Sequence, residues 1–261
     1  MMDEKLKSFS RILEVLETLR VECPWDKKQT IHTLRPLTIE ETYELSDAII
    51  REDFSEIKKE IGDVFLHLIF YAKIAEEKGM FNIADVLNSE CEKLIYRHPH
   101  IYGDKKDLSE DEVKQNWEKL KLKKESNSLF EGVPTSLPSL VKASRIQEKA
   151  RGVGFDWDNK EDVWNKVVEE LNELNVEVEN NNQAKIEEEF GDLMFAMVNY
   201  ARFINVNPDT ALEKANKKFI ERFELMEQIA KDKNEEIYHQ PLEVMDKFWV
   251  EAKNMIKKRS G

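Results

Sequence analysis

The chain contains the stretch EIGDVFLHLIFYAKIA at residues 60–75 and a second stretch of the same design, EFGDLMFAMVNYARFI, at residues 189–204. In each, a Glu, an apolar residue, a Gly and an Asp precede a long run that is almost wholly apolar. A helix that is apolar on all sides is normally buried in a protein core. We therefore expect a central, buried helix in each half of the chain, with acidic side chains where its apolar run begins.

The similarity extends over most of the sequence. EETYE at 40–44 corresponds to EELNE at 169–173, and in both copies 16 residues separate the last Glu of this motif from the Glu of the next. Flanking matches are SRIL at 10–13 with SRIQ at 144–147, and PWD at 24–26 with DWD at 156–158. We predict two tandem units, 1–124 and 139–261. A linker at 125–138, rich in Ser, Pro, Gly and Asn, would join them.

Apolar residues recur at helical spacing throughout both units, and no segment shows the alternation of a strand. The sequence therefore predicts an all-α bundle. Thr38 followed by Glu41 resembles a capping box, so we expect it to begin a helix, and Asp53 or Ser55 to cap the next. The predicted helices are 3–20, 38–51, 54–78, 83–97 and 109–124, then a helix containing 163–178, and 184–205, 208–232 and 241–258.

Composition excludes several functions. The formal net charge of −13 argues against a nucleic-acid-binding surface, because phosphate backbones require a basic face. The N-terminal residues lack the apolar core of a signal peptide, and no stretch suggests a membrane span. The two cysteines, Cys23 and Cys91, are expected to be reduced in a cytoplasmic protein.

The acidic motifs have the spacing of a metal site. Residues three or four apart share one face of a helix, and a short turn would place the two acidic helices side by side. Clustered carboxylates repel one another unless cations neutralise them, and a set of oxygen ligands suits Mg²⁺, with Mn²⁺ as a substitute. The candidate metal ligands are Glu41, Glu44, Glu60 and Asp63 in the first unit and Glu170, Glu173, Glu189 and Asp192 in the second.

Basic residues follow each acidic set and suggest a polyphosphate ligand, which a metal and cationic side chains bind together. Their alternative role is that of a solvated helix face. Trp157 and Trp249 are candidates for stacking on a base, or alternatively for anchoring helix ends in the core. The remaining candidate substrate-binding residues are Lys93, Arg97, Lys214, Asn216, Lys218 and Arg222.

Taken together, these motifs resemble the MazG family of nucleoside triphosphate pyrophosphohydrolases over nearly the whole chain. The resemblance implies an all-α fold in which units of the four-helix-bundle type pair across a homodimer. It also implies Mg²⁺-dependent hydrolysis of ribo- and deoxynucleoside triphosphates to monophosphate and diphosphate, with broad base specificity. It also implies that the C-terminal unit is the main catalytic one. The segments that carry it are CPWDKKQT (23–30), EETYELSDAI (40–49), REDFSEIKKEIGD (51–63), YRHPHIYGD (96–104), VGFDWD (153–158), IEEEFGD (186–192) and EKANKKFIERF (213–223).

On this basis the four acidic residues of the second unit hold the metal, and Glu169 or Glu170 accepts the proton of a water that attacks the α-phosphorus. Lys218 and Arg222 would offset charge on the diphosphate leaving group. Two alternatives remain: a narrower hydrolase, dUTPase-like or specific for a modified nucleotide, and a non-catalytic helical interaction module with a structural metal site.

Overall fold

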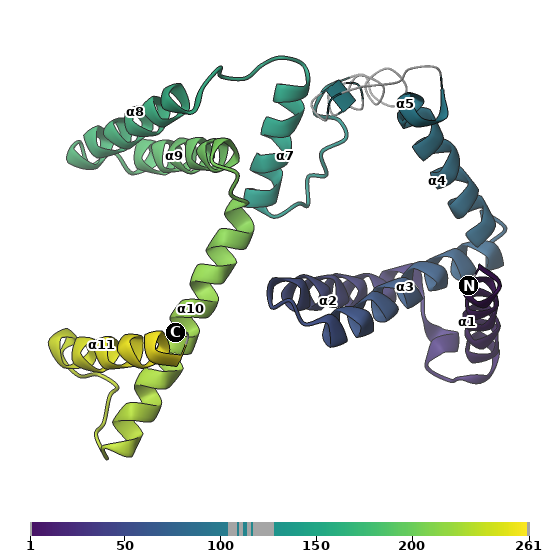
Figure 1. Cartoon of the computed structure of the whole chain (residues 1–261), viewed down its shortest axis with the longest axis horizontal. Coiled ribbons are helices and arrows are strands. Elements are labelled where there is room, and N and C mark those ends of the chain that lie inside the picture. The colour runs from purple at the N-terminus through teal and green to yellow at the C-terminus, as the bar shows by residue number, and fades with distance from the viewer. Residues whose placement is uncertain (1, 104–108, 110–111, 114–115, 117–127, 260–261) are drawn as a thin grey trace. The chain divides into compact units, whose positions relative to one another are not determined.

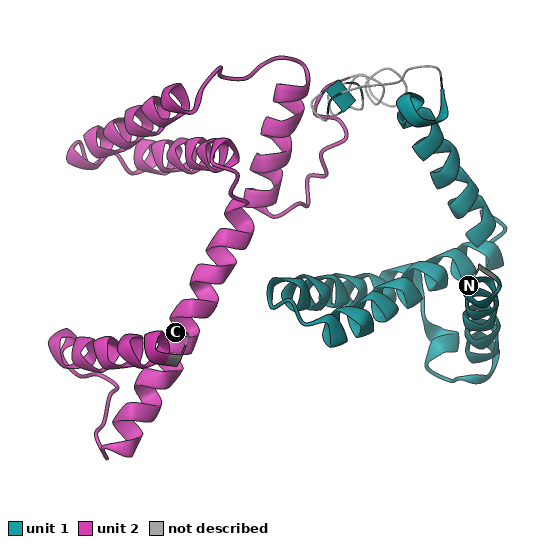
Figure 2. Ribbon diagram, in the orientation of Figure 1, with its two compact units in different colours: residues 1–120 teal, residues 121–261 magenta. Residues whose placement is uncertain are grey.

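The computed structural model describes residues 2–103, 109, 112–113, 116 and 128–259. The chain forms two compact units, Met1–Leu120 and Lys121–Gly261 (Figure 2). Every regular element within the described residues is a helix, which confirms the all-α prediction (Figure 1). Most of the predicted helix at 109–124 lies outside the described residues, and the linker at 125–138 stays a prediction.

The first unit is built around the antiparallel pair α2 (Ile31–Ile50) and α3 (Phe54–Glu77), which a short turn joins. Its core contains Leu16, Leu34 and Phe70, contributed by three different helices. The flanking elements are α1 (Met2–Glu22), the short 3₁₀ helix η1 (Asp26–Lys28), α4 (Ile83–Arg97) and α5 (Pro99–Tyr102).

The start of α2 differs from the prediction. Thr30, not Thr38, is the N-cap, and it forms a capping box with Thr33. Thr38 lies inside the helix, where its hydroxyl contacts the Leu34 carbonyl at 3.0 Å and the Tyr71 hydroxyl at 2.7 Å. The prediction rested on the capping-box spacing of Thr38 and Glu41, which also occurs by chance inside a helix, and α2 in fact includes Pro36 in its second turn. The capping role of Asp53 is confirmed, because its carboxylate accepts the backbone N–H groups of Ser55 and Glu56.

The second unit repeats the central pair as α8 (Lys160–Glu179) and α9 (Gln183–Phe203), with α7 (Ser139–Gly152) packed on α9. α10 (Pro208–Asp232) then leads away from the pair, and α11 (Leu242–Arg259) packs on its distal part (Figure 1). Met226, Ile229 and Phe248 form the core between these last two helices. The three predicted helices from residue 184 onward agree with α9, α10 and α11 to within two residues.

Within one chain α9 is buried on one side only, so the prediction that it is buried all round is wrong. Ala196 and Asn199 face the interior, whereas Phe190, Met194 and Met197 are 56%, 39% and 43% exposed. These three apolar residues are spaced i, i+4 and i+7, and therefore form one face of the helix. An apolar face of this kind is typical of a surface that a partner covers. No helix in the described part of the chain is long and apolar enough to cross a membrane.

Candidate functional site

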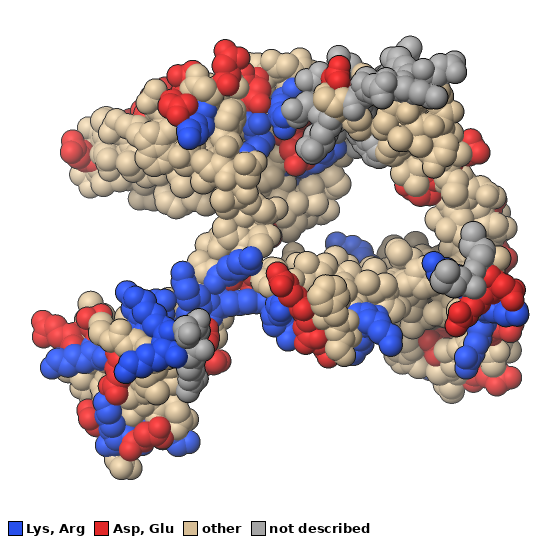
Figure 3. Space-filling view, in the orientation of Figure 1, with Lys and Arg blue, Asp and Glu red and all other residues tan. Residues whose placement is uncertain are grey.

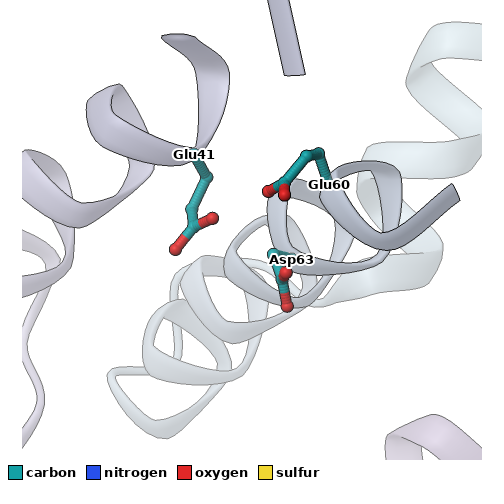
Figure 4. Close-up of side chains that lie close together, drawn as sticks. All are labelled: Glu41, Glu60 and Asp63. Atoms are coloured by element: carbon teal, nitrogen blue, oxygen red, sulfur yellow. The ribbon is translucent and has the colours of Figure 1, made fainter. Parts of the chain in front are cut away.

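The first carboxylate cluster lies between α2 and α3. α2 contributes Glu41 and α3 contributes Glu60 and Asp63, and one oxygen from each lies within 4.8 Å of the others. Figure 4 shows the three carboxyl groups in the space between the helices. Glu60 is 2% exposed, and its Oε1 accepts a hydrogen bond from Lys59 at 2.8 Å. Its Oε2 is buried and has no hydrogen-bond partner among the residues that the structure describes.

The second cluster repeats this arrangement between α8 and α9. Oxygen atoms of Glu170 and Glu173 from α8 and of Glu189 from α9 lie within 4.8 Å of one another. Glu170 is buried, whereas Glu173 is exposed. Lys166 contacts both Glu169 and Glu170 at 2.7 Å. Four residues separate Lys166 from Glu170, so this ion pair follows from the helical repeat.

The fourth predicted ligand of each set, Glu44 or Asp192, is outside these groups of three but close enough to act on them electrostatically. The pKa of Glu41 is raised, first by desolvation and then by the charges of Asp63, Glu44 and Glu60. The pKa of Glu189 is raised by desolvation and by Glu173 and Asp192, while Lys185 opposes the shift. In both clusters, burial and the neighbouring carboxylates thus make the ionised form of a further carboxyl group unfavourable.

The buried glutamate of each cluster also pairs with a lysine that sequence reasoning missed, and these two lysines come from different helices of the pair. In the first unit Lys59 stands beside Glu60 on α3, whereas in the second unit Lys166 stands on α8. When the two units are aligned, Leu37 of the first corresponds to Lys166 of the second, and Glu188 of the second corresponds to Lys59 of the first. Hydrogen bonds to the glutamates raise the pKa of both lysines. The sequence feature that could have revealed them is a lysine directly before, or four residues before, a predicted acidic ligand.

The donor set fits a hard divalent cation. All candidate ligand atoms are carboxylate oxygens, which Mg²⁺ and Mn²⁺ prefer to nitrogen or sulfur. A buried carboxylate oxygen without a partner is costly, and Glu60 Oε2 is such an atom among the described residues. Each lysine neutralises only part of its cluster. We therefore take both clusters as candidate metal centres.

A cavity of about 310 Å³ opens beside the second cluster. Glu170 and Asp192 belong to both the acidic set and the cavity wall, so the two are continuous. The rest of the wall is mainly apolar and comes from α7, α8, α9 and the loops before α7 and α8. Trp157, a predicted base contact, lies in this wall and is partly exposed.

The cationic candidates of the second unit lie elsewhere in the chain. None of the residues of α10 or α11 is among those that line the cavity. On α11, Trp249 packs on Phe219 with ring centroids 5.0 Å apart, and the Arg222 guanidinium lies 5.3 Å from its ring centroid. Trp249 therefore anchors α11 on α10, which is the alternative role predicted for it from the sequence. Lys and Arg side chains gather over these helices on the face in Figure 3, and Lys214, Asn216 and Lys218 are exposed on α10.

The corresponding pair of the first unit lies on α4, outside the carboxylate cluster. Lys93 forms an ion pair with Glu90, and Arg97 is buried. The structure therefore brings together the predicted carboxylates and Trp157, and within one chain it does not bring the predicted phosphate-binding cations to them.

These features define a class: an all-α protein of two related units, each with a carboxylate cluster between two antiparallel helices. A family model described as the MazG nucleotide pyrophosphohydrolase domain matches residues 29–102 and 159–226, together more than half of the chain, and each match includes one cluster. The chain belongs to the MazG family.

Two relatives match over nearly their full length. A nucleoside triphosphate pyrophosphohydrolase of Escherichia coli K12 is 40% identical over 257 residues, which cover 95% of this chain and 98% of that protein. A nucleoside triphosphate pyrophosphohydrolase/pyrophosphatase MazG of Thermotoga maritima is 44% identical over 251 residues, covering 94% and 95%. The aligned length includes both units of this chain.

Proposed function

We propose that this protein hydrolyses ribo- and deoxynucleoside triphosphates to monophosphate and diphosphate, with Mg²⁺ held by the second unit. The observation that carries the proposal is the continuity of the second carboxylate cluster with a largely apolar cavity, which provides a place for phosphates next to a place for a nucleoside. The two full-length relatives, named for this activity, support it. Mn²⁺ is expected to replace Mg²⁺, because the ligands are the same oxygen atoms.

Glu170, Glu173, Glu189 and Asp192 are the residues that would hold the cation. When bound there, Mg²⁺ offsets the charge of phosphate oxygens and lowers the pKa of a coordinated water. Of the two candidate bases, Glu170 lines the cavity, whereas Glu169 lies on the exposed side of Lys166. We therefore assign proton acceptance from the attacking water to Glu170. Glu169 helps to hold Lys166 in place.

The cations expected at the diphosphate leaving group, Lys218 and Arg222, would come from a second copy of the chain. Two observations support this homodimer. Neither residue lines the cavity of its own chain, and the apolar face of α9 formed by Phe190, Met194 and Met197 is exposed. Pairing two copies would cover that face and allow the basic α10 of one copy to approach the acidic site of the other.

The test is release of diphosphate from several ribo- and deoxynucleoside triphosphates, with Mg²⁺ and with a chelator. Glu173→Ala should lower kcat by about a hundredfold or more while the circular dichroism of the helices is retained. Glu44→Ala is the matched change in the first unit and should keep most of the activity. Turnover of a single base would instead favour the narrow hydrolase, and no turnover of any substrate would favour the interaction module.

A further inference from the structure

The connection between α7 and α8, residues 153–159, carries two aromatic side chains of the cavity wall. Phe155 and Trp157 both line the cavity, yet they are 76% and 41% exposed. Side chains with so few buried contacts cannot keep a loop in place, because local rigidity comes from buried apolar contacts and protected hydrogen bonds. The position of this part of the wall is therefore set by the backbone and by polar contacts.

Each end of the connection is held by the helix that it adjoins. At the end of α7, Gly154 has a φ of 88°, and the N–H of Phe155 donates to the Ala150 carbonyl at 3.0 Å, as in a Schellman motif. At the start of α8, the Asn159 side chain accepts the backbone N–H of Asp162 at 2.9 Å. The middle of the connection needs a contact of another kind.

Asp156, in the middle of the connection, is held by Arg202 near the end of α9. The guanidinium donates to both carboxylate oxygens, from Nη1 to Oδ2 at 2.9 Å and from Nη2 to Oδ1. The same guanidinium donates to Asn199 Oδ1, from Nη2 at 2.8 Å and from Nε at 3.3 Å. The side chains of Asp156 and Arg202 are only 20% and 21% exposed. We call these three residues the clasp; its bidentate ion pair fixes orientation as well as distance.

The clasp decides how Arg202 should be interpreted. This arginine lines the cavity, and an arginine beside a nucleotide would ordinarily bind phosphate. Here every nitrogen of the guanidinium already donates to Asp156 or Asn199, and its central carbon lies 4.5 Å from the centroid of the Phe203 ring. A phosphate could bind Arg202 in the usual bidentate way only by displacing a member of the clasp.

We propose, on the basis of the function proposed above, that Arg202 is a positioning residue. Through Asp156 it holds the α7–α8 connection in the place where the aromatic side chains of the connection contact the nucleoside. A wall that is already ordered does not have to be ordered when substrate binds, so the clasp reduces the free-energy cost of binding. None of the predicted metal ligands belongs to the clasp, so its loss should change KM rather than kcat.

The first unit holds its corresponding loop without this ion pair. When the two units are aligned, Pro24 stands at the place of Asp156 and Lys73 at the place of Arg202. A proline has no carboxylate to accept a hydrogen bond. Lys73 instead forms ion pairs at 2.9 Å with one glutamate of α1 and one of α3. The aspartate and the arginine of the clasp thus belong to the unit that we propose to be catalytic.

Hydrogen exchange measured by mass spectrometry tests the clasp without any hydrolysis. The backbone amides of residues 153–159 should exchange several-fold faster in Arg202→Met and in Asp156→Ala than in wild type, while the circular dichroism of the helices is retained. Arg202→Lys keeps the charge but not the bidentate fork, and should lie between. Lys233→Met, which breaks an ion pair with Glu251 outside the cavity wall, is the control. Unchanged exchange of the connection in both clasp variants would overturn the proposal.

Kinetics distinguish positioning from direct binding of phosphate. Arg202→Met and Asp156→Ala should each raise KM for ATP, GTP, CTP and UTP by roughly three- to tenfold, with kcat changed by less than about twofold. The double variant should be no worse than either single one, because both changes break the same clasp. Arg202→Lys should recover part of the KM.

Inorganic tripolyphosphate, which has no nucleoside, should inhibit all these proteins equally. Weaker inhibition of Arg202→Met would show that Arg202 binds phosphate itself, and would overturn the positioning role. Faster exchange of the connection with an unchanged KM would overturn it as well.

Calorimetric binding of AMP separates a failure of this inference from a failure of the proposed function. If wild type hydrolyses no triphosphate, the proposed function fails, yet AMP should still bind roughly three- to tenfold more weakly to Arg202→Met than to Lys233→Met. Equal behaviour of these two variants toward AMP would overturn the positioning role, whether or not triphosphates are hydrolysed.

Discussion

Lys166 lies one turn before Glu170 on α8, and its ammonium group contacts that carboxylate at 2.7 Å. The contact places a positive charge where a divalent cation would also bind. We expect Lys166→Met to bind Mn²⁺ several-fold more tightly in the absence of nucleotide, because the cluster becomes more negative. Titration calorimetry would measure this. Lys160→Met, near the exposed start of the same helix, is the control, and weaker Mn²⁺ binding by Lys166→Met would contradict the expectation.

The raised pKa of Glu189 predicts a pH dependence in metal-free protein. The folded state binds the proton of the Glu189 carboxyl group more tightly than the unfolded chain does. The protonated group therefore adds to the free energy of unfolding below the unfolded pKa, and this contribution is lost as pH rises through the folded pKa. With a chelator present, the Tm of Glu189→Gln minus the Tm of wild type should therefore increase between about pH 4 and pH 7. Thermal unfolding followed by circular dichroism would show it. A difference in Tm that stays constant with pH would refute the assigned electrostatics.

The proposed homodimer, with sites shared between copies, predicts complementation. Glu173→Ala and Lys218→Ala should each be nearly inactive alone. After the two are mixed and allowed to exchange subunits, about a quarter of wild-type activity should return, since half of the dimers are then mixed and each has one intact site. The Glu173→Ala and Glu189→Gln pair is the control, because both changes affect the same acidic cluster. The control pair should not recover activity, and absence of recovery in the test pair as well would show that Lys218 acts within its own chain.

The exposed apolar face of α9 predicts what holds the dimer together. Met194→Lys should shift the protein toward monomer in light scattering coupled to gel filtration, because a charge would be buried in the interface. Ala184→Lys, an exposed change on a different face of α9, should leave the mass unchanged. If Met194→Lys remains a dimer at low micromolar concentration, another surface forms the contact.

The two units, the helices and the acidic clusters could be predicted because each depends on local spacing that the chain repeats. The carboxylates of Glu170 and Glu189 come together for this reason: their helices are neighbours joined by a short turn. Other features depend on packing that spacing does not encode. The side of α9 that stays exposed depends on which helices cover it, and α10 turned out to lead away from the pair.

Gln147 and Asn199, two amides of the cavity wall, were not predicted either. An amide within a helix has no distinctive spacing, and these two residues differ from Leu13 and Phe70, with which they align in the first unit. Lys59 and Lys166 were not predicted because they stand at different positions of the repeat, so neither has a matching lysine in the other unit.

The location of those lysines on different helices limits how the halves of this protein can be recombined. A chimera that joins α2 to α9 would have neither Lys59 nor Lys166, since Leu37 and Glu188 occupy their places. The reciprocal chimera would have both lysines facing one acidic set. The lysine that partly neutralises each cluster thus belongs to a different helix in each unit, so exchanging one helix between the units would change the net charge of the cluster.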